Sequence, residues 1–526
     1  MNIRNYNKYF HLHTISGIII TAVLFVFFFA GSFAFFKNEI NNWQNNTPKG
    51  TFTSNTLNYN AIADSVNNQY GLYGRNVSFR IGDKSRIIGL VVSPSKDTLN
   101  PKAGERGFVM YDTYTNESKS YAEQYSLGEF LYRLHFLAPV NSLVDMSIPP
   151  GYLIAGIVAF IFLFALITGV LIHWQKIVSN FFIFRPWEKL KTVWTDLHTA
   201  LGVLTSPFLF IFAISGSYFF LTSYFFANAI ASLGYGGDIK KLQAEVGGKK
   251  GPKTEIPFTN TPNNQQVDIN SYVQQTLNKW EDGIITFVEV SNYGDQNMQV
   301  KILGKVSEHK QFNSKGEIIY TIATGEIDEK ANPNDSSTYS EVVSNLMYVL
   351  HFGSFGGYAT RIIYFLIGMA GCFVIISGVL IWLVARDKKN VPEKKRKFNF
   401  WLTNIYLSIC LSMYPVTALA FIAVKLNPTG GQTFIYSFYF YTWLALTIVL
   451  AARKSLYKTN RDCLLAGSAI GLLIPITNGI VTGTWFWTNW KNQYYDILII
   501  DIFWIIIPCI TLYAWYLVRK KQNKEV

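Results

Sequence analysis

A long apolar stretch of the chain opens with the sequence HTISG at residues 13–17, and a second apolar stretch opens with HTALG at residues 198–202. The dipeptide Gly-Ser follows each motif, at residues 31–32 and again at residues 216–217, so both blocks are separated by 185 residues. Short motifs that recur in order and at one separation indicate an internal repeat. The chain therefore carries a duplication that begins at its first apolar segment.

Two further blocks extend the duplication. The tripeptide Leu-His-Phe occurs at residues 134–136 and 350–352, and TGVLI at residues 168–172 corresponds to SGVLI at residues 377–381. The repeated unit is an apolar helix, a polar segment and a second apolar helix, and it occurs twice in the same orientation. Parallel repeats of this kind build binding sites at the interface between the two copies.

The composition indicates a membrane protein, because 50% of the 526 residues are hydrophobic and only 15% are charged. A hydrocarbon core about 30 Å thick needs roughly 20 apolar residues in a helix. Eight stretches meet this length, near residues 15–36, 152–174, 200–225, 360–385, 400–424, 434–452, 463–483 and 497–518. We interpret the first as an uncleaved helix, since its apolar run is too long for a signal peptide.

The net charge of +13 is concentrated in alternate connections between these stretches. Residues 386–397 and 519–524 are rich in Lys and Arg, whereas two short loops on the opposite side carry Lys425 and Lys491 alone. This asymmetry predicts a bacterial inner-membrane protein with both termini in the cytoplasm and its polar segments in the periplasm. The basic loops suit contact with membrane lipid, and no basic patch remains that would favour nucleic acid.

The predicted fold is a mainly α-helical membrane protein with about eight transmembrane helices and two small α+β periplasmic domains, inserted in the duplicated helix–domain–helix unit. Its parts are a first helix (1–37), an outer domain (38–150), helices two and three (151–225), a second outer domain (226–358), a fourth helix (359–386), a basic loop (387–398) and four C-terminal helices (399–526). Within the outer segments, the periodicity predicts helices over residues 59–70 and 269–280. Strands are predicted over residues 77–81, 87–92, 284–290, 298–303 and 318–322.

The motif His-xxx-Gly that opens helices one and three, with Ser/Thr-Gly-Val-Leu-Ile closing helices two and four, resembles membrane proteins that carry PepSY domains and associated transmembrane helices. The resemblance covers roughly residues 8–385. It implies a membrane protein linked to iron acquisition, in a family that includes ferric-siderophore reductases holding two b-type haems.

Six of the seven histidines cluster at predicted membrane boundaries, where imidazoles could serve as axial haem ligands. On the outer side, His135 extends the apolar stripe of residues 127–134, and His351 extends the matching stripe of Val343, Leu346, Met347 and Leu350. On the inner side, the duplication pairs His13 with His198, and His173 is an alternative ligand whose counterpart is Trp382. We therefore expect two haem b groups, with iron held by His13, His198, His135 and His351.

The remaining candidates are weaker. Arg361, near the outer end of the fourth helix, could pair with a haem propionate, although a plain interfacial anchor is the favoured role. His11 and His309 are expected to be solvated. Asp501 is the clearest carboxylate within a predicted span, and such residues are often functional.

The favoured function is an oxidoreductase, resembling a ferric-siderophore reductase, that passes electrons from a quinol or a separate reductase to a ferric siderophore or another iron chelate outside the membrane. One alternative is a transporter or permease component. Another is a non-catalytic PepSY scaffold that regulates a peptidase. Neither a nucleotide-binding motif nor a soluble hydrolase motif is present.

Overall fold

The computed structural model describes residues 3–48, 53–82, 86–144, 146, 149–239, 241–242, 256–263, 267–307, 314–335 and 339–525. The chain separates into two compact units. The first, called the helical unit, comprises Met1–Pro48, Ser126–Gly237 and Met347–Val526. The second, called the sheet unit, comprises Lys49–Tyr125 and Asp238–Leu346.

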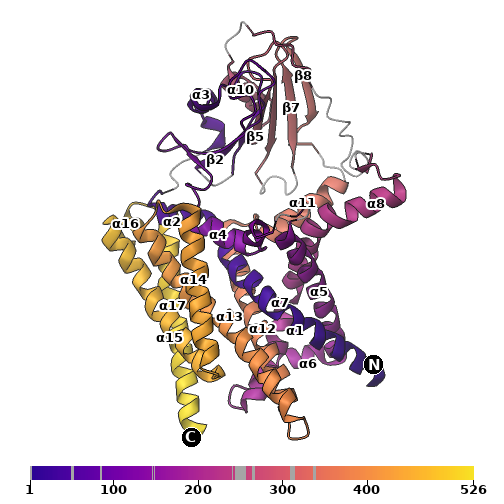
Figure 1. Ribbon diagram of the computed structural model, residues 1–526, viewed down its shortest axis with the longest axis vertical. Coiled ribbons are helices and arrows are strands. Elements are labelled where there is room, and N and C mark those ends of the chain that lie inside the picture. Colours follow the sequence, from indigo (N-terminus) through magenta and orange to yellow (C-terminus); the bar gives the residue numbers. More distant parts are fainter. Residues whose placement is uncertain are drawn as a thin grey trace. The chain divides into compact units, whose positions relative to one another are not determined.

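Within the described part of the chain, eight helices are long and apolar enough to cross a membrane. They are α1 (Ile3–Ala34), α5 (Pro150–His173), α7 (Leu190–Ser217), α12 (Gly357–Arg386), α13 (Glu393–Leu426), α14 (Gly431–Ala452), α15 (Leu456–Thr482) and α17 (Tyr495–Glu525) (Figure 1). The helix α7 continues into a π-helix, η4 (Tyr218–Phe226). All eight predicted stretches correspond to these helices, which confirms a multi-pass membrane protein.

The four helices of the duplication form one bundle. Helix α1 packs against α5 and α12, and α7 packs against the same two neighbours. The two helices that carry the His-xxx-Gly motif, α1 and α7, are therefore each flanked by the two helices that carry the Ser/Thr-Gly motif, α5 and α12. Helix α13 contacts both α1 and α12, and α15 joins α13 to α17, so the C-terminal helices continue from one side of this bundle.

Short helices lie at one end of the helical unit. They are α2 (Lys37–Asn45), α4 (Leu127–Leu134), the C-terminal part of α11 (Tyr339–Phe352) and α16 (Phe486–Lys491). Ser126 begins α4 by accepting a hydrogen bond from the Glu129 backbone nitrogen. The predicted apolar stripe of α4 is buried as expected, whereas Val343 of the corresponding stripe in α11 is 40% exposed. The stripe of the second repeat is therefore less complete than its sequence suggested.

Helix α2 connects the short helices to the C-terminal helices. It packs against α4 on one side and against α13 and α17 on the other. The Gln44 side chain shows this double contact, because its Oε1 accepts from the Leu127 nitrogen and its Nε2 donates to the Pro428 carbonyl.

The sheet unit contains one antiparallel sheet with the strand order β4-β3-β2-β1-β5-β6-β7-β8. Its strands are β1 (Val77–Arg80), β2 (Ile87–Val92), β3 (Gly107–Asp112), β4 (Glu117–Ser120), β5 (Ile284–Ser291), β6 (Gln299–Lys305), β7 (Gly316–Thr321) and β8 (Glu326–Ala331). Within the described residues, each polar segment supplies four strands and one covering helix, α3 (Tyr59–Tyr70) or α10 (Ile269–Lys279). The two sets meet where β1 pairs with β5, with Phe79 opposite Val288.

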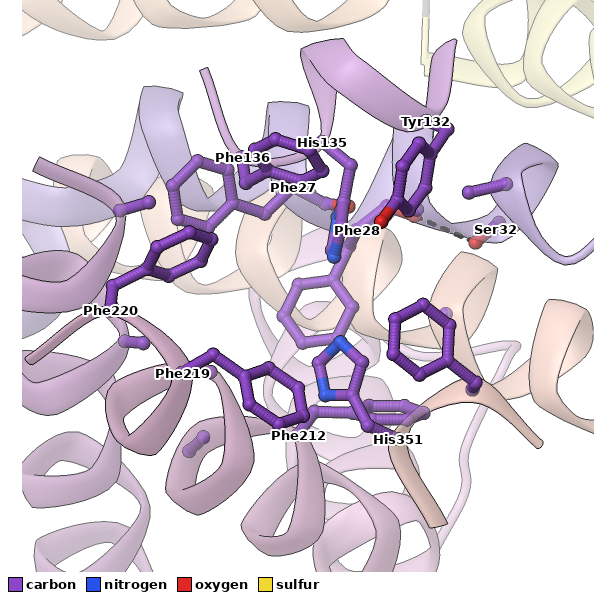
Figure 2. Close-up of a pocket in the computed structure, with 18 of the residues that line it drawn as sticks. Phe27, Phe28, Ser32, Tyr132, His135, Phe136, Phe212, Phe219, Phe220 and His351 are labelled. Carbon is purple, nitrogen blue, oxygen red and sulfur yellow. Dashed lines mark hydrogen bonds between the residues drawn. The ribbon is translucent and has the colours of Figure 1, made fainter. Parts of the chain in front are cut away.

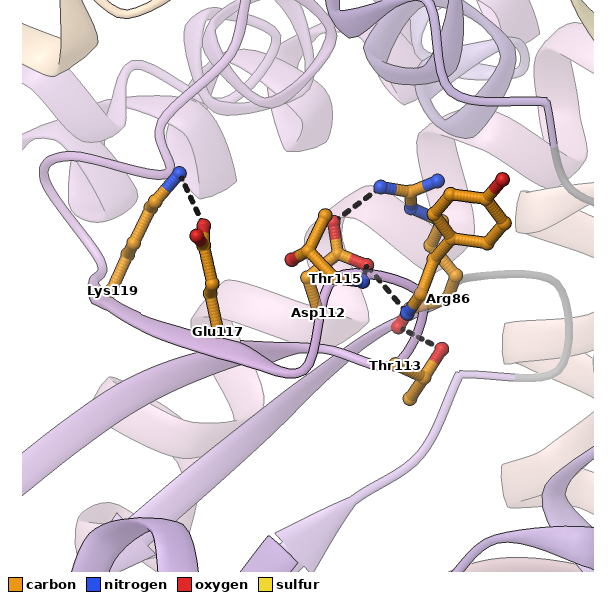
Figure 3. A network of polar contacts seen from close by, with 7 residues as sticks. Arg86, Asp112, Thr113, Thr115, Glu117 and Lys119 are labelled. Atoms are coloured by element: carbon orange, nitrogen blue, oxygen red, sulfur yellow. Dashed lines mark hydrogen bonds and ion pairs between the residues drawn. The ribbon is translucent and has the colours of Figure 1, made fainter.

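One face of the sheet carries the core, because strand residues alternate between its two faces. Phe79, Leu90, Val288 and Ile302 are fully buried and pack with Val66 of α3. At the β3–β4 hairpin, Arg86 pairs with Asp112, and the Thr113 hydroxyl donates to the Arg86 carbonyl (Figure 3). These contacts hold the β3–β4 turn against the residue that precedes β2.

Candidate functional site

The inner histidines of the duplication lie close together inside the helical unit, with the edge of one ring toward the face of the other. His13 projects from α1 and His198 from α7, with ring centroids 6.1 Å apart and ring planes at 76°. Two elements 185 residues apart in sequence therefore deliver one imidazole each to the same place, as the repeat predicted.

Each inner imidazole is held by the neighbouring helix. Nδ1 of His13 donates to the Ala165 carbonyl at 2.8 Å, and Nδ1 of His198 donates to the Val374 carbonyl at 2.9 Å. A carbonyl oxygen can only accept, so the proton of each neutral ring lies on Nδ1 and the Nε2 lone pair stays available. A backbone acceptor at one ring nitrogen is the usual support of a histidine that ligates metal through the other.

The Ser/Thr-Gly motif explains how these rings fit against their helices. Thr168 donates its hydroxyl to the Ala165 carbonyl at 3.0 Å, and Ser377 does the same to Val374 at 3.0 Å. A Cβ atom at Gly169 or Gly378 would lie 3.1 Å from Cε1 of His13 or His198 respectively. These glycines leave room for the imidazoles, whereas a Cβ at Gly17 or Gly202 would meet no atom within 4 Å.

The outer histidines form a second pair. His135 follows α4 and His351 lies near the end of α11, with ring centroids 6.0 Å apart. Nδ1 of His135 donates to the Phe27 carbonyl at 2.7 Å. Nδ1 of His351 contacts the Ser215 hydroxyl at 2.7 Å, and that hydroxyl donates its own proton to the Ile211 carbonyl. His351 is therefore the donor to Ser215, and all four rings share one tautomer.

The outer pair lines a cavity of about 460 Å³. Figure 2 shows both imidazoles projecting into it among Phe27, Phe28 and Phe212. A Cβ at Gly31 would lie only 2.5 Å from Nδ1 of His135, so this glycine lets the ring approach α1. A mostly apolar cavity with a few convergent polar groups is typical of a cofactor or small-molecule site.

Burial keeps the outer histidines neutral. It lowers the pKa of His135, and it lowers the pKa of His351 to about 3, with the neighbouring His135 adding to the shift. Neutral imidazole is the form that ligates metal. Both rings are therefore ready to act as ligands at neutral pH.

The other predicted site residues lie as follows. His173, at the end of α5, is close enough to His13 and His198 to interact with both electrostatically. His11 is exposed. His309 lies outside the described residues.

Arg361 does not line the cavity described above. Its Nη1 donates to the Glu39 carboxylate at 2.8 Å and to the Phe35 carbonyl at 3.1 Å. The cavity is instead lined by Arg133, whose Nε donates to Glu129 at 2.8 Å. Sequence reasoning missed Arg133, although its place two residues before His135 on the predicted amphipathic helix was a usable signal.

A buried polar cluster lies between α2 and the C-terminal helices. The Trp43 indole donates to Asp501 at 2.8 Å, and the Asn478 and Asn489 amides also donate to that carboxylate. The Lys425 ammonium donates to the Trp43 carbonyl and lies 4.4 Å from the centre of its ring. Asp501, the carboxylate that the sequence placed within a predicted span, is fully buried.

The spacing of both histidine pairs fits a bis-imidazole iron site. Metal–nitrogen bonds of about 2 Å on opposite sides of one ion place the two ring centroids roughly 6 Å apart, and the pairs measure 6.1 and 6.0 Å. Within the described ranges, no group of three or more His, Cys, Asp or Glu side chains is placed to hold a metal ion. Two imidazoles are a sufficient protein contribution when a porphyrin supplies the other four donors.

Comparison with known proteins gives one family match. The sequence model of the PepSY-associated TM region matches residues 10–385, which include both repeats and all four paired histidines. No curated protein matched the chain.

Proposed function

The chain belongs to the PepSY-associated TM region family, and we propose that it is a haem-containing membrane oxidoreductase that delivers electrons to an iron(III) chelate. His13 and His198 would hold one haem b, and His135 with His351 would hold a second. Haem with two imidazole ligands supplies one-electron transfer between the ferric and ferrous states.

The single observation that carries this proposal is the doubled geometry of the histidines. Both pairs have centroids about 6 Å apart, and every ring directs Nδ1 to an oxygen acceptor and keeps Nε2 for a ligand bond. A proton-relay histidine in a transporter has no need of this spacing twice. The geometry therefore favours the haem proposal over the transporter alternative.

The two pairs lie at different depths along α1. His13 is 14 residues before Phe27, whose carbonyl holds His135, and a rise of 1.5 Å per residue makes this distance about 21 Å. That distance is a large part of a hydrocarbon core about 30 Å thick. Two redox centres at these depths could connect the two faces of the membrane.

Aromatic side chains of α1, α5 and α7 form part of the wall of the outer cavity. The ring of Phe28 contacts Phe162 at a centroid distance of 5.5 Å and Phe212 at 6.5 Å. Gly371 makes room for this ring, because a Cβ there would lie 2.9 Å from Phe28 Cδ1. The outer site is therefore lined largely by apolar side chains.

The direction of transfer follows from the charge distribution. Basic residues at 386–397 and 519–524 favour a cytoplasmic location for the end of the helical unit that carries them. His13 and His198, the pair nearer that end, would receive electrons from a quinol or a separate reductase. The outer pair would pass one electron to each iron(III) chelate. Iron(II) is held less firmly than iron(III) by hard oxygen ligands such as those of siderophores, so reduction promotes release.

The proposal is tested by reducing the purified protein anaerobically and adding ferric siderophores together with a ferrous-trapping dye. Haem reoxidation with formation of the iron(II)–dye complex is expected. Haems that remain reduced with every ferric chelate, while small oxidants discharge them, would leave an electron carrier and remove the iron substrate. A preparation without haem would overturn the redox proposal and favour a transporter or scaffold.

A further inference from the structure

The four imidazoles are not supported identically. His13, His198 and His135 donate to backbone carbonyls at 2.7–2.9 Å, and Nδ1 of His198 also lies 3.4 Å from the Ser377 hydroxyl. His351 instead donates to the hydroxyl of Ser215 at 2.7 Å. Ser215 is fully buried, so water does not compete for this contact. The difference sets the outer pair apart, because its two members have different acceptors.

The duplication identifies what Ser215 replaces. Phe27, whose carbonyl supports His135, corresponds in the second repeat to Phe212, which is 185 residues further along. The carbonyl of Phe212 lies 3.4 Å from the Ser215 hydroxyl, and the ring of Phe212 packs against His351 at 5.7 Å. In the first repeat the position of Ser215 is occupied by Ala30, which offers no hydroxyl, and His135 bonds to the carbonyl.

The two kinds of acceptor have different effects on a metal ligand. An amide oxygen carries more negative charge than a hydroxyl oxygen, so it draws the Nδ1 proton more strongly and makes the imidazole a stronger electron donor through Nε2. A stronger donor stabilises the more positive, oxidised iron. A hydroxyl acceptor therefore leaves the reduced form relatively more stable.

We propose that Ser215 raises the reduction potential of the outer iron site by holding the N–H group of His351 on a hydroxyl instead of the Phe212 carbonyl. This inference rests on the proposed haem function. Ser215 is a positioning residue, since it acts through His351. Its effect favours electron transfer from the inner pair to the outer pair.

The test is a spectroelectrochemical titration of the intact, haem-loaded protein. The outer wave is first identified by its loss in His351→Ala. Ser215→Ala makes the second repeat resemble the first, so the Phe212 carbonyl becomes the acceptor, and the outer midpoint potential should fall while the inner one stays unchanged. Ser215→Thr keeps the hydroxyl and should behave like the native chain.

Ser217→Ala is the matched control. Ser217 lies on the same helix and donates to the Ala213 carbonyl at 2.7 Å, but it is not the acceptor of His351. An outer potential that stays constant or rises in Ser215→Ala would overturn the inference. A native protein that shows no haem bands would instead overturn the proposed function, so the two failures are distinguishable.

Discussion

Gly169 lies so close to His13 that a Cβ atom at this position would be 3.1 Å from the imidazole Cε1. In the second repeat, Gly378 lies equally close to His198. The Ser/Thr-Gly motif therefore helps to hold the inner imidazoles. Its glycine leaves room for the ring, which a substitution can test.

We expect Gly169→Val to displace His13 and to remove the inner haem. Haem content per chain should fall by about half, because the outer pair supplies its own two ligands. Gly17→Val is the control, since a Cβ at that position meets nothing within 4 Å. Equal haem loss in both variants would show that the effect is general damage to the helix bundle and not displacement of His13.

His135→Ala and His351→Ala should each remove the same outer haem. The two rings lie 6.0 Å apart, so both would hold the same haem, and the loss of either imidazole would remove much of its attachment to the protein. Haem content should fall by about half in either variant and no further in the double variant. Additive losses would mean that the two histidines do not share one haem.

Asp501→Asn should destabilise the helical unit. Asp501 and Lys425 are 0% and 1% exposed, and removal of one of two opposite buried charges leaves the other uncompensated. Thermal unfolding in detergent would measure the loss. Because Asp501→Asn combined with Lys425→Met removes both charges, the double variant should be more stable than Asp501→Asn alone; a purely additive loss would contradict coupling between the two.

Cysteine labelling tests the membrane topology. In a chain whose four native cysteines are replaced by alanine, an impermeant thiol reagent applied to intact cells should modify Thr115→Cys and spare Asn390→Cys. The expectation follows from the basic composition of residues 386–397. Labelling at residue 390 would reverse the topology and the proposed direction of electron transfer.

Local patterns in the sequence predicted much of the fold. Apolar length identified the eight membrane helices, and the duplication predicted that His13 lies near His198 and His135 near His351. The periodicity placed α3 and α10 within one residue of their observed ends. These features depend on residues that are near one another or related by the repeat.

Long-range pairing was less accessible. Nothing in the strand sequences specifies that β1 pairs with β5 and joins two polar segments in one sheet. The ion pair between Arg361 and Glu39 depends on how α2 packs, and the contact between Ser215 and His351 breaks the symmetry that guided the other predictions. Such contacts are set by tertiary packing and leave no local pattern in the sequence.

The central claim is that each histidine pair holds one haem. The most direct measurement is the haem content of the purified protein, combined with its visible and electron paramagnetic resonance spectra in the oxidised and reduced states. We expect two b-type haems per chain, both low-spin because each iron would have two imidazole ligands. A colourless protein, a single haem per chain or a high-spin spectrum would contradict it.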